Sequence, residues 1–264
     1  MLKVLDISKT FYPGTVNEKC ALSKVSLTLN EGDFVTIIGG NGAGKSTLLN
    51  CISGLYPVDE GTITVDNIDL TKMPEHRRAK YLGRVFQDPM MGTAANMGID
   101  ENLAVALRRG KRRTLKWGIP HSEREQYKTL LATLNLGLEK RLSLKTGLLS
   151  GGQRQALTLL MATLQKPKLL LLDEHTAALD PKTAQRVLEL TEEIVQKYNM
   201  TTIMVTHNMK DALRFGDRLL MMHEGKLILD ISGQEKKDLK VADLLQMFER
   251  ASGNEFVDDR LLLG

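Results

Sequence analysis

The stretch GGNGAGKST, residues 39–47, decides the fold because it lies between an apolar run, FVTIIG, and a predicted helix that ends before Pro57. Its spacing fits G-x-x-x-x-G-K-[ST] in the strand–loop–helix context which that pattern requires. Glycines allow backbone N–H groups to converge on phosphate oxygens, and the N-terminus of the following helix adds partial positive charge. The stretch therefore predicts a nucleoside triphosphate site formed by Gly39, Asn41, Gly42, Ala43, Gly44, Lys45, Ser46 and Thr47.

Side chains in and beyond this loop carry the expected chemistry. Lys45 would reach the β- and γ-phosphates, and the Ser46 hydroxyl would ligate Mg²⁺. The run KLLLLDEH, residues 168–175, is typical of a strand buried on both faces, and it ends at the carboxyl edge where α/β proteins bind ligands. Asp173 fits a Mg²⁺ role through a water, and Glu174 fits a general base that polarises an attacking water.

A second glycine-rich stretch, LLSGGQRQ at residues 148–155, precedes a predicted helix, so its N–H groups are free to bind an anion. It belongs to a helical lobe on the far side of the chain from the first stretch. We expect it to serve the nucleotide of a second copy, which makes two composite sites under twofold symmetry. A plain helix N-cap is the alternative. The residues expected to act on the partner's nucleotide are Ser150, Gly151, Gly152 and Gln153.

Length and composition are ordinary for a globular protein, with 264 residues of which 42% are apolar and 26% charged. The net charge of +4 does not favour nucleic acid as a partner. Cys20 and Cys51 form no metal or redox motif. The start of the chain lacks the apolar core of a signal peptide, and no apolar run reaches the length of a bilayer span. If the protein works at a membrane, we therefore expect another chain to attach it there.

Strands and helices are expected to alternate, which predicts a parallel sheet flanked by helices. A hairpin should turn at Glu224 and Gly225, and residues 90–167 read as a helical lobe that interrupts the core. The expected strands are residues 3–7, 24–39, 61–66, 82–87, 168–173, 201–207 and 218–223. The expected helices are residues 44–55, 100–109, 122–134, 150–165, 181–198 and 236–251.

The motifs GGNGAGKST, LLSGGQ, LLLLDE, AALD and VTH, in this order, resemble those of the ATPase subunits of ATP-binding cassette (ABC) transporters, from ISKTF to HEGKL. The resemblance implies an α/β fold: a P-loop nucleotide-binding domain with a parallel core sheet, an antiparallel β subdomain and an inserted α-helical subdomain. Residues 1–264 would form one domain, with its core in 1–89 and 168–235. The helical signature subdomain would be 90–167, and 236–264 a short C-terminal helix and tail.

The same resemblance implies an ATP hydrolase that uses Mg²⁺ and drives transport. A homodimer of ATPase subunits would close on ATP and open after hydrolysis, because ATP binds the closed state more tightly. Transmembrane permease subunits and a solute-binding lipoprotein are the implied partners, and nucleic acid is not. The chain would be peripheral, on the cytoplasmic face of the cell membrane.

Four more residues take roles from the resemblance. Phe11 looks like the aromatic that stacks on adenine, with neighbouring Tyr12 as the fallback. Gln87 resembles the loop glutamine that contacts Mg²⁺ and the attacking water and hinges the helical lobe. Asp180 resembles the aspartate that passes between subunits, although a helix N-cap explains it equally. His207 matches the histidine at the γ-phosphate, so the implied catalytic residues are Glu174, His207, Gln87 and Lys45.

The sequence departs from the family at His175, where most members have proline, and a neutral or charged imidazole there could shift the proton affinity of Glu174. DEHTAALD together with TFYPGTVNE is similar to a bacterial import group associated with tryptophan or tyrosine uptake. An exporter or lipoprotein-releasing system and a non-transport iron–sulfur assembly ATPase remain alternatives. The basic run at residues 108–118 is either a solvated loop or a contact for anionic lipid headgroups.

Overall fold

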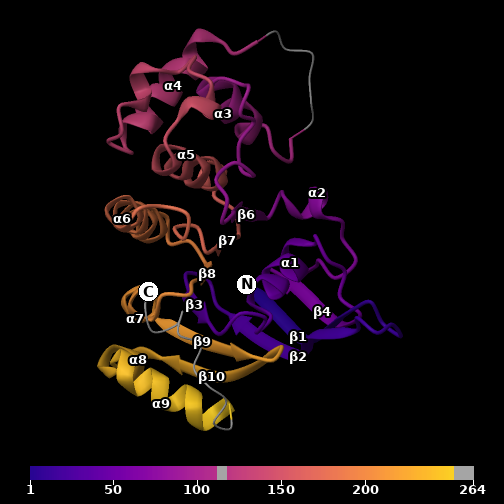
Figure 1. The fold of residues 1–264 in the computed structure, drawn as a ribbon. Coiled ribbons are helices and arrows are strands. Elements are labelled where there is room, and N and C mark those ends of the chain that lie inside the picture. The colour runs from indigo at the N-terminus through magenta and orange to yellow at the C-terminus, as the bar shows by residue number, and fades with distance from the viewer. Residues whose placement is uncertain (112–117, 253–264) are drawn as a thin grey trace.

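The central sheet has six strands in the order β10-β9-β3-β8-β7-β6 (Figure 1). The computed structural model describes residues 1–111 and 118–252. All strands of this sheet run parallel except β10, which pairs antiparallel with β9. The central strands read as unbroken apolar runs because both of their faces are buried. The strands are β3 (Phe34–Ile38), β6 (Leu82–Val85), β7 (Leu169–Asp173), β8 (Thr202–Val205), β9 (Arg218–His223) and β10 (Lys226–Ser232).

A second, antiparallel sheet has the order β2-β1-β4-β5 and lies beside helix α1 (Lys45–Ser53) in Figure 1. Apolar side chains of this sheet and of α1 share one core cluster with those of β3 and β7. The strands are β1 (Leu2–Phe11), β2 (Lys19–Leu29), β4 (Glu60–Val65) and β5 (Ile68–Asp69). Helix α1 ends at Ser53, earlier than expected, because Gly54 adopts a left-handed conformation with φ of 87° and its N–H bonds back to Asn50.

The expected helical lobe lies between β6 and β7 in the chain and at the top of Figure 1, where α5 packs against β6. Its helices pack around Leu103, Tyr127, Leu131 and Leu157, which are all buried. The elements are α3 (Ile99–Leu107), α4 (His121–Ala132), the short turns η1 (Leu138–Lys140) and η2 (Thr146–Leu148), and α5 (Gly151–Thr163). The fold class predicted from the sequence, with a parallel core sheet, an antiparallel sheet and inserted helices, is confirmed.

Three further helices flank the sheets: α2 (Glu75–Arg78), α6 (Pro181–Tyr198) and α7 (Met209–Arg214). The bounds of α6 match the prediction because Asp180 caps its start and Asn199, at φ of 46°, ends it. The hairpin between β9 and β10 also turns where predicted, with Glu224 and Gly225 both at positive φ.

The C-terminal region corrects the sequence prediction of one helix over residues 236–251. Two helices form instead, α8 (Gly233–Asp238) and α9 (Val241–Ser252), and the chain is extended at Leu239 between them. The Lys236 ammonium is buried and donates to the carbonyl oxygens of Phe215 and Gly216, which fixes α8 beside α7. The α9 residues Leu244 and Phe248 pack in a separate apolar cluster with residues of β9. No helix among the described residues is long and apolar enough to cross a bilayer.

Candidate nucleotide-binding site

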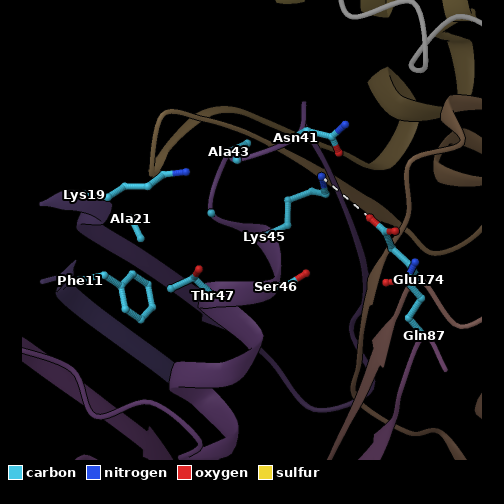
Figure 2. Close-up of a pocket in the computed structure, with 12 residues that line it drawn as sticks. Phe11, Lys19, Ala21, Asn41, Ala43, Lys45, Ser46, Thr47, Gln87 and Glu174 are labelled. Carbon is cyan, nitrogen blue, oxygen red and sulfur yellow. Dashed lines mark ion pairs between the residues drawn. The ribbon is translucent and has the colours of Figure 1, made fainter. Parts of the chain in front are cut away.

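A cavity of about 450 Å³ opens between the antiparallel sheet and the start of α1 (Figure 2). The structure thus brings together side chains that are far apart in sequence: Phe11 from β1, the phosphate-binding loop, Gln87 after β6 and Glu174 after β7. Phe11 lies in the wall of the cavity and meets Tyr56 edge to face, with ring centroids 5.1 Å apart. Tyr12 is 68% exposed and does not line the cavity, so the geometry favours Phe11 for an adenine contact.

The backbone of residues 39–44 needs glycine at its two ends. Gly39 has φ of 152°, and a Cβ there would lie 2.2 Å from the carbonyl oxygen of Met222. Gly44 has φ of 100°, and its Cβ would lie 2.6 Å from the carbonyl oxygen of Ala21. Both neighbours are backbone atoms that cannot rotate away, so the loop can take this shape only with glycine at both positions.

Lys45 lies across its own loop rather than in open solvent. Its Nζ donates to the carbonyl oxygens of Gly39 at 2.7 Å and Gly40 at 3.1 Å, and it is 4.0 Å from Glu174 Oε1. Burial lowers the pKa of Lys45, while Glu174 and Asp173 act in the opposite direction. A bound phosphate would therefore replace two carbonyl contacts of this ammonium.

Asp173 and Ser46 provide adjacent oxygen ligands at the carboxyl end of β7. The Ser46 hydroxyl donates to Asp173 Oδ1 at 3.1 Å, and Arg84 Nη2 donates to Asp173 Oδ2 at 3.3 Å. Burial raises the pKa of Asp173, opposed by Arg84 and Ser46. Among the described residues no cluster of three or more His, Cys, Asp or Glu could hold a metal unaided. One hydroxyl and one carboxylate fit Mg²⁺, which takes hard oxygen ligands and completes its shell with waters and substrate phosphates.

Glu174 follows Asp173 with a left-handed backbone, at φ of 44°, which is uncommon for a residue other than glycine. Its N–H donates to the carbonyl oxygen of Val205, and its Oε2 is 3.7 Å from His207 Nδ1. Contact with His207 lowers the pKa of Glu174, and contact with Glu174 raises the pKa of His207. The carboxylate is thus within 4.0 Å of the Lys45 ammonium, as Figure 2 shows, and it also lies near the His207 ring. It lines the cavity.

His175 faces away from this group of charges. Its Nε2 is 3.1 Å from Thr191 Oγ1 in the middle of α6, and the Thr191 hydroxyl donates its proton to the carbonyl oxygen of Val187. The ring must therefore donate from Nε2 to Thr191. Complete burial lowers the pKa of His175 to about 4, so the ring is neutral at physiological pH. His175 joins the segment after Glu174 to α6, and it places no charge beside the carboxylate.

The residues of the second glycine-rich stretch lie outside the cavity that the phosphate-binding loop forms. Ser150 caps α5: its Oγ accepts from the Gln153 N–H at 3.3 Å, and Gln153 Oε1 accepts from the Ser150 N–H at 3.2 Å. Gly152 packs so closely on α6 that an added Cβ would lie 2.1 Å from Thr183 Cγ2. Asp180 caps α6 by accepting from the Thr183 N–H at 3.1 Å. The capping alternatives for Ser150 and Asp180 are thus both realised, and neither excludes a contact with a second copy.

The sequence analysis missed two charged residues at the site, Lys19 and Arg84, and also the small cavity-lining residue Ala21. Lys19 lines the cavity and pairs with Phe11 across strands β1 and β2. Arg84 pairs with Leu171 across β6 and β7, which puts it diagonally opposite Asp173 on the same face of the sheet. Neither lies in a recognisable motif, and only the register between strands places them. The basic run at residues 108–118 falls partly outside the described residues.

Comparison with known proteins agrees with this geometry. Residues 22–177 match the ABC transporter family. The tyrosine transport ATP-binding protein of Clostridioides difficile (strain R20291) is 47% identical, over 95% of this chain and 100% of that protein. The energy-coupling factor transporter ATP-binding protein EcfA2 of Clostridium tetani (strain Massachusetts / E88) is 33% identical over 93% of this chain and 83% of its own.

Among solved structures, an ATP-binding cassette in a dimeric post-hydrolysis state bound to ADP and Pi superposes with a TM-score of 0.75 at 30% identity. It covers 88% of this chain and 98% of its own. The ADP conformation of another ABC transporter cassette superposes with a TM-score of 0.76 at 29% identity, over 94% and 98% of the two chains. From the site geometry and these matches together, the chain belongs to the ABC transporter family and is an ATPase of the ABC type.

Proposed function

We propose that two copies of this chain power a bacterial importer of an aromatic amino acid, with tyrosine as the first candidate cargo. The observation that carries this assignment is the 47% identity to a tyrosine transport ATP-binding protein along its full length. Relatives at 32–33% identity serve spermidine/putrescine and methionine import, so the direction of transport is shared more widely than the cargo.

The proposed catalytic unit is a symmetric dimer. Phe11 would stack on adenine, and Lys45 with the loop N–H groups would bind the phosphates. Ser150 and its neighbours lie away from the cavity of their own chain, at a helix start where the cap uses the N–H groups of Ser150 and Gln153 but not those of Gly151 and Gly152, and this supports a role on the nucleotide of a second copy. A related cassette forms a dimer bound to ADP and Pi.

Within each site, Glu174 would act as the general base that takes a proton from the attacking water. His207 lies 3.7 Å from Glu174 and would keep that carboxylate ionised while facing the γ-phosphate. Gln87 lines the same cavity and would orient the water. Ser46 and Asp173 would hold Mg²⁺, which neutralises phosphate charge when bound.

The membrane part of the transporter would be built from other chains. Membership of the ABC transporter family and similarity to a transport ATP-binding protein support permease subunits as partners, with this chain peripheral on the cytoplasmic face of the cell membrane. We propose residues 90–167 as the unit that contacts them, with 1–89 and 168–235 as the core and 236–264 as the C-terminal segment. A solute-binding lipoprotein would deliver the cargo.

Uptake by a reconstituted complex tests this proposal. The chain would be purified with the membrane protein that accompanies it and placed in proteoliposomes, and ATP-dependent accumulation of labelled tyrosine would be measured. We expect uptake, competed by tryptophan if the cargo class is aromatic. Glu174→Gln should slow hydrolysis by about 10²- to 10⁴-fold, the range typical of a lost general base, while nucleotide binding is retained. ATP-driven efflux, or a complex that carries no amino acid, would contradict the import assignment.

A further inference from the structure

Arg84 is a largely buried cation on β6 that connects the two halves of the candidate Mg²⁺ site. Its side chain is only 12% exposed. Nη2 donates to Asn50 Oδ1 at 2.6 Å and to Asp173 Oδ2 at 3.3 Å, and Nη1 donates to Ser53 Oγ at 3.1 Å. The guanidinium also lies over the Phe86 ring, 4.5 Å from its centroid. Four side chains therefore fix this group in one place.

The anchors of Arg84 belong to the helix that carries the other metal ligand. Asn50 and Ser53 lie on α1, the helix that begins at Lys45 and also bears Ser46. Asp173 ends β7. A guanidinium is planar and rigid. The bonds of Arg84 to Asn50 and Ser53 on α1 therefore determine the direction of the N–H that it donates to Asp173.

Asp173 uses its two oxygens for different partners. Oδ2 accepts from Arg84, and Oδ1 accepts from Ser46. With Oδ2 held, the carboxylate cannot rotate without breaking the contact to Arg84, and Oδ1 stays beside the Ser46 hydroxyl. Groups that bond to a metal ligand in this way commonly change metal affinity by 10- to 100-fold when they are removed.

We propose that Arg84 is a positioning residue for Mg²⁺: it holds Asp173 Oδ1 next to Ser46 Oγ, so that the two ligands are already placed when Mg-ATP arrives. This inference rests on the proposed role of Ser46 and Asp173. It concerns how the ligands are held, and the rest of the family assignment does not depend on it.

The test is the metal dependence of nucleotide binding in Arg84→Met and Arg84→Lys. Binding of a fluorescent ATP analogue would be titrated with Mg²⁺, and bound Mn²⁺ would be counted by EPR in the presence of ADP. For Arg84→Met we expect half-saturating metal to rise by roughly 10- to 100-fold, with metal-free nucleotide affinity unchanged. Arg84→Lys keeps the charge but cannot reach three partners at once, so we expect a similar rise.

Arg78→Met is the matched control. Arg78 is also buried and also bonds to α1, through the carbonyl oxygens of Cys51 and Ile52, but the structure gives it no contact with Asp173. Both methionine variants should lower the melting temperature, and only the Arg84 variant should shift the metal titration. An equal shift in Arg78→Met, an unchanged titration in Arg84→Met, or parent-like behaviour of Arg84→Lys would overturn the proposal. If the parent protein itself showed no metal dependence, the Mg²⁺ site would be wrong, and the role of Arg84 would fail with it; a shift absent only from the Arg84 variants would overturn the role of Arg84 alone.

Discussion

Glu174 and His207 form the ion pair on which the proposed chemistry depends, and their pKa values predict how the pair responds to pH. The pKa of Glu174 lies below its ordinary 4.5, mainly through His207, and that of His207 lies above its ordinary 6.5, mainly through Glu174. Because the pKa of Glu174 is lowered on folding, its ionised form stabilises the fold above pH 4.5. This contribution is lost as the pH falls through the lowered pKa. Because the pKa of His207 is raised on folding, its protonated form stabilises the fold below pH 6.5. This contribution is lost as the pH rises through the raised pKa.

Both contributions are therefore complete between about pH 4.5 and 6.5. We predict that His207→Ala lowers the melting temperature most within this window, and that the difference from the parent shrinks on either side. The effect should be small, because the His207 side chain is 45% exposed and solvent weakens the pair. Melting curves across the pH range check this, and a difference that kept growing at alkaline pH would contradict it.

At the same scale, motif spacing explains which residues could be predicted. Gly39, Lys45, Ser46 and Asp173 follow from local patterns, since a loop, a helix start and a strand end each impose their own residue types. Lys19 and Arg84 could not be found this way. Each is placed at the site by pairing with a neighbouring strand, Lys19 opposite Phe11 and Arg84 opposite Leu171. The sequence of one strand alone does not determine this pairing register.

Between elements, Gly152 in the second glycine-rich stretch packs α5 closely on α6. We predict that Gly152→Ala destabilises the fold by about 1–3 kcal/mol, because its Cβ would lie 2.1 Å from Thr183 Cγ2. Gly151→Ala is the matched control, since its nearest neighbour is the flexible end of Leu179 at 3.2 Å. Chemical denaturation measures both. Thr183→Ser removes the clashing methyl and should restore the stability of Gly152→Ala; failure of this rescue would mean that the contact is not the cause.

Elements with strong local signals were predicted well, and the C-terminal helices show what local signals omit. Helix α6 has an N-cap, a proline at its first position and a left-handed C-cap, so its ends are defined by the sequence itself. The break at Leu239 has one local marker, Asp243, whose carboxylate accepts from the Lys240 N–H at the start of α9. The end of α8 is also held by buried Lys236, which bonds to carbonyl oxygens of residues 215 and 216, a contact across about twenty residues that amphipathic periodicity cannot reveal.

For the whole molecule, the composite-site proposal predicts complementation between two inactive variants. Lys45→Ala should disable the phosphate-binding loop and leave Ser150 intact. Ser150→Asp keeps a favourable N-cap on α5 but puts a carboxylate where the partner's phosphates would bind. A mixed dimer contains one site with both parts intact, so mixing the two proteins should recover up to about half of the parental ATPase activity per mixed dimer. Near-zero activity in the mixture would contradict the composite site, and parent-like activity of Ser150→Asp on its own would show that each chain works alone.

The fold class of the whole molecule could be predicted from the sequence. The packing of its sheets and helices against one another could not. Buried apolar runs separated by helices predict a parallel sheet, and the interruption at residues 90–167 predicts the lobe. How the antiparallel sheet packs on α1, and so where Phe11 lies relative to the loop, depends on tertiary contacts between segments distant in the chain.

Helix α6 touches both functional surfaces of its chain: His175, next to Glu174, bonds to Thr191 in its middle, and Gly152 packs on Thr183 in its first turn. A shift of Glu174 on nucleotide binding would therefore be transmitted along α6 to the face that we propose contacts the neighbouring copy. With this coupling, the two nucleotides of a dimer would not bind independently. The occupancy of both sites would rise steeply over a narrow range of ATP concentration.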